Sequence, residues 1–190
     1  MDQFLVSMLM NNAQITVDGD EPIRGLCYPT NEILRLKKLY ELSMKLSGDP
    51  MDVFVHIAQM IGEILDVKVV CLSEIQGELL YFMSVYINGN IMTNAGSCLI
   101  DTTPCATVKN SKDMRIYDRV IERFPHAKFL QDHNAYSYCG LPSFNSEGNV
   151  IAVTCLLDDR PRNYSLEDQE LLHILGQRIA ALSTTYGSII

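Results

Sequence analysis

The segment from residue 150 to residue 168 constrains the fold more than any other part of this sequence. Residues 150–157 read VIAVTCLL, a nearly unbroken run of apolar and β-branched residues of strand length. The turn signal NSEG precedes this run at residues 145–148, and DDRPRNY follows it at residues 158–164. This order predicts a central β-strand that leaves the core at Asp158 and runs into a fixed turn.

A helix is predicted to begin directly after the turn and to close the domain. Ser165 and Asp168 have the Ser-x-x-acid spacing of a helix N-terminus, where a hydroxyl and a carboxylate accept hydrogen bonds from free backbone amides. A smaller apolar line, formed by Ile174 and Ala181, indicates either a dimer contact or simple surface exposure. The main apolar face should cover the sheet, and it consists of Leu171, Leu172, Leu175, Ile179, Leu182 and Tyr186.

Two further helices are predicted near the start of the chain. Residues 30–46 carry two apolar stripes, which implies two partners: the domain itself and the same helix in a second subunit. Asp49 and Pro50 are placed as the N-cap and first residue of the next helix, and His56 falls on its solvent side. The two stripes of residues 30–46 are Ile33, Leu36, Tyr40 and Met44 on one side and Leu39, Leu42 and Leu46 on the other. The apolar face of the next helix consists of Phe54, Ile57, Ala58, Ile61, Ile64 and Leu65.

Strand patterns fill most of the remaining chain. Gln76-Gly77 and Asn88-Gly89-Asn90 are tight-turn signals between apolar segments, and they predict antiparallel neighbours. Helices, then sheet, then a final helix are typical of an α+β sandwich with the helices packed on one face. The expected strands are residues 67–75, 79–87, a stretch within 91–100, 136–144 and 150–157.

Several of these motifs, in this order, resemble the C-terminal half of a GAF domain. They are SYCGLP at residues 137–142, the Gly148 turn, VIAVTCLLDD, PRNYSLED and the LL..LGQRIAAL of the last helix. LIDTTPC at residues 99–105 is similar to the strand-to-helix segment of GAF domains from bacterial sensor proteins. The resemblance covers roughly residues 32–186. Its departures are Cys139, Ser143 and Ala152, where the family usually or often has an aliphatic residue, leucine and glycine.

The resemblance implies a GAF/PAS-like central antiparallel sheet of five or six strands with N- and C-terminal helices on one face. Residues 1–29 are then a poorly ordered extension, residues 30–48 a linker helix and residues 49–187 the GAF domain. It further implies a sensory or regulatory module that binds an unidentified small molecule and relays the change through its terminal helices, as a dimer. The output domain would be a kinase, a cyclase or a transcription regulator, in the same chain or a separate one.

The walls of the usual GAF ligand pocket can be carried over to this sequence. No Cys-His dipeptide is present for attachment of a phytochrome-like bilin, and the Asn-Lys-Phe-Asp-Glu signature of cyclic-nucleotide-binding GAF domains is absent. Two alternatives remain open: a thiol-dependent reductase of free methionine sulfoxide that uses Cys98, Cys105 and Cys139, and a ligand-free dimerisation module with a filled core. The expected ligand-binding residues are Cys98, Thr103, Cys105, Val108, Tyr117, Phe124, Phe129 and Tyr138.

Five side chains have a possible chemical role beside a structural one. Thr103-Pro104 predicts a short helix through Val108 with Cys105 in its first turn, where the helix dipole would attract a small anion and lower the thiol pKa. In the alternative, favoured interpretation Cys105 is a packing residue. His126 and His133 could bind a metal ion or haem, although loop histidines are common. The pair Asp158-Asp159 could share a proton, but a turn with local ion pairing is the favoured role.

Composition excludes several classes of function. Fifteen Lys and Arg against 23 Asp and Glu give a net charge of −8 without a dense basic cluster, which argues against nucleic acid as a partner. The first ten residues, MDQFLVSMLM, do not form a signal sequence or membrane span, so a cytoplasmic protein is expected. The six cysteines form no Cys-x-x-Cys pair, and Cys71, Cys139 and Cys155 fall in strands as buried thiols.

Overall fold

A single antiparallel sheet organises the part of the chain that the computed structural model describes, residues 49–186, with side chains described as far as residue 183. The predicted extension 1–29, the predicted helix 30–46 and the side chain of Tyr186 lie outside these limits. The sheet has seven strands in the order β3-β2-β1-β7-β6-β5, with β4 paired to β2. The strands are β1 (Val69–Gln76), β2 (Leu79–Ile87), β3 (Asn90–Thr93), β4 (Ser97–Leu99), β5 (Arg115–Asp118), β6 (Ser137–Phe144) and β7 (Val150–Asp158).

This sheet confirms the predicted fold class and extends it by two short strands. The apolar stretch within residues 91–100 divides into β3 and β4, which both pair with β2. β5 is an edge strand that the sequence analysis did not predict, because only four residues pair with β6. β7 lies between β1 and β6, as expected for the central strand, and Val153 within it is completely buried.

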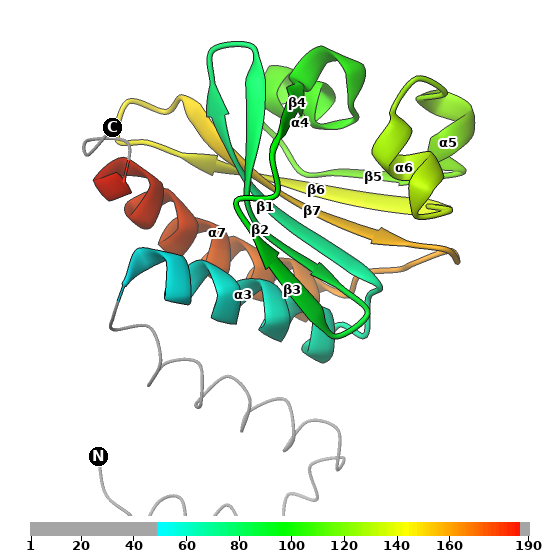
Figure 1. Ribbon diagram of the computed structural model, residues 1–190, viewed down its shortest axis with the longest axis horizontal. Helices are drawn as coiled ribbons and strands as arrows, with labels where there is room; N and C mark the ends of the chain where they lie inside the picture. Colours follow the sequence, from blue (N-terminus) through cyan, green and yellow to red (C-terminus); the bar gives the residue numbers. More distant parts are fainter. Residues whose placement is uncertain (1–48, 187–190) are drawn as a thin grey trace, which may run out of the picture. The chain divides into compact units, whose positions relative to one another are not determined.

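Two long helices, α3 (Pro50–Ile64) and α7 (Leu166–Tyr186), cover one face of the sheet (Figure 1). Asp49 caps α3 as predicted, since its carboxylate accepts a hydrogen bond from the Met51 amide at 2.8 Å. His56 is partly exposed and donates to the backbone oxygen of Asp52. The buried residues of α3 are Val53, Phe54, Ile57, Ala58, Ile61 and Gly62.

The predicted capping box starts α7. The Ser165 amide donates to Asp168 Oδ2 at 3.0 Å, and the Asp168 amide donates to Ser165 Oγ at 3.2 Å. Ile174 is 65% exposed, and Ala181 is also exposed. The stripe predicted to cover the sheet is buried at Leu171, Leu172, Leu175, Ile179 and Leu182.

The opposite face of the sheet carries the chain between β4 and β6 (Figure 1). This stretch contains a 3-10 turn, Ile100–Thr102, and α4 (Cys105–Ser111), which contacts β6 and β7. After β5 it forms two short helices, α5 (Val120–Arg123) and α6 (Lys128–Asp132). We call residues 119–134 the lid, because α5 and α6 contribute buried side chains to the core on this face.

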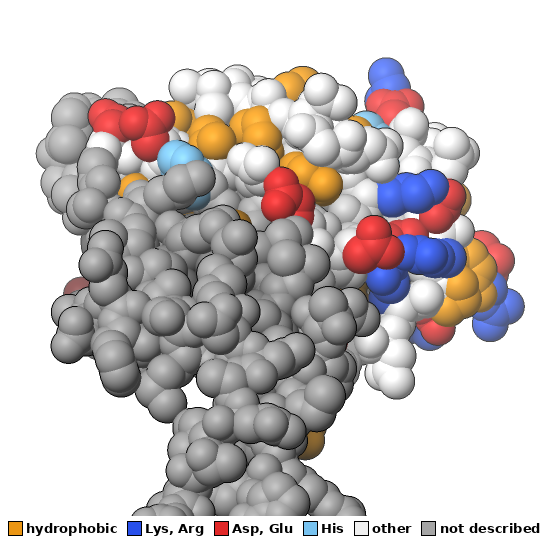
Figure 2. Space-filling view, turned by 90° about the horizontal axis from the view of Figure 1, so that it is seen from below, with side chains coloured by type: hydrophobic (Ala, Val, Ile, Leu, Met, Phe, Trp, Pro, Cys, Tyr) orange, Lys and Arg blue, Asp and Glu red, His pale blue; other side chains and the backbone are white. Residues whose placement is uncertain are grey.

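The turn after β7 is held by ion pairs, which confirms the structural interpretation of the two aspartates. The Asp158 side chain is fully buried and accepts from Arg162 Nε at 2.8 Å. Arg160 pairs with Asp66 at 2.7 Å, and Lys68 pairs with Asp159 and lowers the pKa of that carboxyl group. Figure 2 views the molecule from the side of the helices and shows acidic and basic side chains close together at the right of the picture. These pairs fasten the start of β1 to the end of β7.

Candidate functional site

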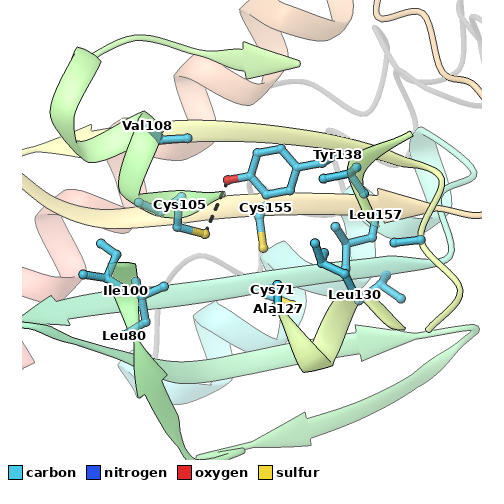
Figure 3. Packing of buried hydrophobic residues seen from close by; sticks show 14 of the residues in the cluster. Cys71, Leu80, Ile100, Cys105, Val108, Ala127, Leu130, Tyr138, Cys155 and Leu157 are labelled. Carbon is cyan, nitrogen blue, oxygen red and sulfur yellow. Dashed lines mark hydrogen bonds between the residues drawn. The ribbon is translucent and has the colours of Figure 1, made fainter. Parts of the chain in front are cut away.

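An apolar cluster fills the space between the sheet and the lid (Figure 3). Strands β1, β2, β6 and β7 contribute its floor, and α4, α5 and α6 contribute its cover. We call it the lid-side cluster. Its buried members are Val69, Cys71, Leu80, Val85, Ile100, Cys105, Val108, Val120, Ala127, Leu130, Ala135, Tyr138, Val153, Cys155 and Leu157.

The eight residues expected to bind a ligand converge on this cluster. Cys105, Val108 and Tyr138 are buried members of it. Thr103 lies beside it, in the turn before α4, where its Oγ1 accepts a hydrogen bond from the Cys105 amide at 3.2 Å. The remaining four are partly buried and pack against the cluster: Cys98, Tyr117, Phe124 and Phe129.

Three thiols and one phenol lie together in the middle of the cluster. Cys71 and Cys155 are opposite each other on the paired strands β1 and β7. The Tyr138 hydroxyl donates a hydrogen bond to Cys105 Sγ at 3.4 Å. In Figure 3 the sulfur atoms of all three cysteines point into the space between α4 and the sheet. Cys155 was not among the expected site residues, although its place opposite Cys71 follows from the strand pairing.

The less favoured interpretation of Cys105, an anion site with a reactive thiol, is wrong. Cys105 is only 4% exposed, because the first turn of α4 faces the core and not the solvent. Its hydrogen bond with Cys155 and its burial raise the pKa of the Cys105 thiol well above the ordinary value, the opposite of the expected direction. Thr103 already satisfies the Cys105 amide. The structure therefore supports the alternative interpretation, in which Cys105 is a packing residue.

The reductase alternative would need Cys98, Cys105 and Cys139 to face one cavity, and they do not. Side chains alternate between the two faces of a strand, so Cys139 points away from the face that holds Tyr138. Its neighbour on that side, Leu141, lies against Gly176 of α7. Burial raises the pKa of Cys139 to about 12. Burial and the nearby Cys105 raise the pKa of the half-buried Cys98 to about 11. High pKa values leave little nucleophilic thiolate, which argues against thiol catalysis.

Aromatic rings join the lid to the sheet. Phe129 of α6 stacks on Phe82 of β2 with 5.8 Å between ring centroids and 19° between ring planes. Tyr117 of β5 stacks on Tyr138 at 6.0 Å and contacts Phe124 at 5.6 Å. Phe82 was missed by the sequence analysis, although its place in a strand next to the buried Leu80 and Met83 indicates a position near the core.

The histidines of the lid have ordinary surroundings. His126 is exposed, and the His133 ring lies 4.4 Å from the Phe129 ring, centroid to centroid. Within residues 49–186 no group of three or more His, Cys, Asp or Glu side chains is arranged to hold a metal ion.

None of the helices in this range combines the length and apolar character that a bilayer crossing requires.

A separate groove of about 640 Å³ lies on the helix-covered side, between the β6–β7 turn and α7. It contains none of the eight expected residues. The buried Ser143 hydroxyl, at a position where the family often has leucine, borders this groove and has no hydrogen-bond partner within the described range. The groove is lined by Pro142, Ser143, Phe144, Asn145, Ser146, His173, Gly176, Gln177, Ala180 and Ala181.

Comparison with known proteins settles the family. The model of the GAF domain family matches residues 49–182, which is more than half of the chain. The chain belongs to the GAF domain family. No curated protein matches it significantly. The sheet and helices of this GAF domain agree with the family match.

Solved structures of GAF domains share the fold at low sequence identity. The GAF domain of a phosphoenolpyruvate-protein phosphotransferase from Coxiella burnetii is 11% identical, with a TM-score of 0.69 over 81% of this chain and 95% of that one. A phycocyanobilin-bound GAF domain from a cyanobacterial phytochrome is 13% identical, with a TM-score of 0.61 over 85% and 98%. The GAF domain of a two-component sensor histidine kinase from Bacillus halodurans is 13% identical, with a TM-score of 0.56 over 70% and 95%.

Proposed function

We propose that this GAF domain is a regulatory module that binds a small molecule beneath the lid and relays binding to its terminal helices. The observation that carries the proposal is that seven of the eight family pocket positions belong to, or pack against, one cluster under the lid, with Thr103 directly beside it. Related GAF domains come from a phytochrome, where one holds phycocyanobilin, and from a sensor histidine kinase. These relatives support a sensory role by analogy.

The strand connections support a relay from the lid-side cluster to the helices. β1 follows α3 and β7 precedes α7, and both strands contribute a cysteine to the middle of the cluster. The pairs Arg160–Asp66 and Lys68–Asp159 hold the two strand ends together. A ligand that shifted β1 and β7 would therefore move the attachment points of both helices.

Native mass spectrometry of the freshly purified full chain, with an absorption spectrum, tests the proposal. We expect a co-purifying small molecule whose occupancy falls in Phe124→Ala, because Phe124 packs against the cluster from the lid and contacts Tyr117. Leu166→Ala, at an exposed position of α7, is the matched control and should keep full occupancy. An unliganded wild-type chain that also fails to retain any compound from a metabolite extract would favour the ligand-free dimerisation module instead.

We further propose that the module acts as a homodimer and passes its signal to an output domain. The two apolar stripes of residues 30–46 and the exposed Ile174 on α7 support a contact between subunits. The double variant Leu39→Glu, Leu42→Glu changes residues outside the described range. We expect this variant to be a folded monomer when its mass is measured by sedimentation velocity. An unchanged subunit count would place the interface elsewhere.

A cytoplasmic location is part of the same proposal. The five cysteines within the described residues are free thiols, which is typical of proteins in reducing compartments.

A further inference from the structure

Among the described residues no Lys or Arg side chain is buried under the lid, and the partly buried His133 ring lies 4.4 Å from the Phe129 ring at the surface of the lid. Within residues 49–186 no Lys, Arg or His is buried; the buried charged residues are Glu74 and Asp158. The basic side chains around the lid-side cluster interact with groups at its margin. Lys109 donates to the Gly77 carbonyl at 3.4 Å, Lys112 to the Gly148 carbonyl at 3.0 Å, and Arg115 to Ser111 Oγ at 2.8 Å. The Arg123 guanidinium lies over the Tyr117 ring at 5.2 Å. An anion buried here would therefore lose its hydration without gaining a buried cation.

The two phenol oxygens under the lid can act only as acceptors for a further partner, because each already donates its hydrogen. The Tyr138 hydroxyl already donates its hydrogen to Cys105 Sγ, and the Tyr117 hydroxyl donates to Thr107 Oγ1 at 3.0 Å. Each phenol oxygen keeps lone pairs that can accept one more hydrogen bond. A ligand with a single O–H or N–H donor would satisfy this arrangement, whereas a carboxylate or phosphate needs donors, and both phenol hydrogens are already engaged.

The aromatic contacts define the shape that fits. Phe129 lies nearly parallel to Phe82, and both rings are only partly buried, so this stack borders the solvent. A flat ring of the ligand can replace Phe129 on the face of Phe82 and keep the stacking contact. A saturated chain of the same volume would lose that contact.

The lid has the local construction of a segment that can open. α5 has four residues and α6 has five, and neither has a side-chain hydrogen bond at its N-cap. Helices this short are not stable by themselves, so tertiary contacts hold them in place. Arg119 and Asn134, which bracket the lid, have φ angles of 51° and 50°, in the left-handed region that costs free energy for residues other than glycine.

From these observations we propose that the ligand of this GAF domain is an uncharged aromatic molecule with one hydrogen-bond donor, of the phenol or indole class. Its ring stacks on Phe82 in place of Phe129, and its donor pairs with the oxygen of the partly buried Tyr117. The inference rests on the proposed function and adds the chemical class of the ligand and the side chains that select it.

A matched pair of fluorescent probes tests the charge selection on the full chain. N-phenyl-1-naphthylamine is uncharged, and 8-anilinonaphthalene-1-sulfonate has the same rings with an added sulfonate. We expect the uncharged probe to bind at least about tenfold more tightly. The titration is repeated at high salt, because the chain has a net charge of −8 and screening removes long-range repulsion of the sulfonate. The preference should persist if desolvation under the lid causes it.

Two variants locate the probe. Phe82→Ala should weaken binding of the uncharged probe by about tenfold, whereas Phe144→Ala, an exposed aromatic position bordering the groove near α7, should leave it unchanged. Should Phe82→Ala fail to fold, competition on the wild-type chain replaces it. Indole is expected to displace the probe, and indole-3-carboxylate at the same concentration is expected not to do so.

The unfavourable outcomes separate this inference from the proposed function. Equal binding of both probes at high salt, with both weakened by Phe82→Ala, would overturn the uncharged class and leave a ligand site under the lid. Weakening by Phe144→Ala alone would place the probe in the groove and overturn the assignment. Binding of neither probe would overturn it as well, and the mass spectrum of the purified chain would then decide separately whether a ligand site exists.

Discussion

Replacing Gly140 with alanine would test how tightly the lid-side cluster is filled. An ideal Cβ at this position would lie 2.2 Å from Tyr138 Oη, 2.7 Å from Tyr138 Cε1 and 2.6 Å from Val108 Cγ2. Carbon atoms in contact are normally about 3.5–4.0 Å apart. Tyr138 is 1% exposed and Val108 is fully buried, so neither side chain can move into solvent.

The expected loss of unfolding free energy follows from these contacts. Overfilling a core costs about 1–3 kcal/mol. Rotation of the Tyr138 ring would also break its hydrogen bond to Cys105, which adds about 0.5–1 kcal/mol. We therefore expect Gly140→Ala to destabilise the domain by about 2–4 kcal/mol, a large share of the roughly 5–15 kcal/mol typical of a domain.

Urea denaturation of the full chain, followed by circular dichroism, measures this loss. Gly176→Ala in α7 is the matched control, because the atoms nearest to its Cβ would be Leu141 Cδ2 at 3.0 Å and Ser143 Oγ at 3.4 Å. The helix favours alanine over glycine by up to about 1 kcal/mol, so the control should stay within about 1 kcal/mol of wild type.

A double-variant cycle identifies the cause of the loss. In a Tyr138→Ala background the ring is gone and Val108 can shift into the vacated space, so Gly140→Ala should cost less than about 1 kcal/mol there. An equal cost in both backgrounds, or no cost in the wild-type chain, would refute the steric argument.

Three further predictions concern the turn, the central strand and the thiols. Arg162→Met leaves the buried Asp158 carboxylate with only Arg160, 3.6 Å away, and should cost about 3–5 kcal/mol in urea denaturation; a loss below about 1 kcal/mol would contradict this. Val153→Asp puts a carboxylate into the core and should give unfolded or insoluble protein, so a soluble variant with an unchanged melting temperature would refute the strand assignment. Brief alkylation should modify the half-buried Cys98 before Cys105. Because the pKa of Cys98 is raised to about 11, its thiolate fraction and labelling rate should rise about tenfold per pH unit from pH 7 to 10, and a plateau near pH 9 would show an ordinary pKa.

Local signals in the sequence predicted much of this fold. The Ser165–Asp168 capping box, the Asp49 cap and the buried stripe of α7 depend on neighbouring residues and on helical periodicity, and the structure confirms all three. The central strand at residues 150–157 was also predictable, because an apolar run of strand length between turn signals is typical of a strand buried on both faces. The edge strand β5 was not, since four residues of alternating exposure give too short a pattern.

Site properties were harder to predict, because they depend on which way an element faces. The N-terminus of α4 could have faced solvent or core, and only its contact with β6 and β7 decides that the Cys105 thiol is buried. Cys139 shows the same dependence: a shift by one residue along a strand reverses the face that a side chain occupies. The family resemblance gave a set of positions that converge on one cluster, but it could not give the pKa of any thiol.

The place of β7 between β1 and β6 has a consequence for synthesis of the chain. β1 is complete by residue 76, but its second neighbour begins only at residue 150. While the ribosome makes the intervening residues, β1 can pair only with β2, and its other edge, with Val69, Val70 and Cys71, stays open. Chains released before β7 would expose this apolar edge to other strands. Truncation ahead of residue 150 should therefore yield aggregates and not a smaller domain, and slow translation just upstream of β7 would prolong the interval in which a chaperone is needed.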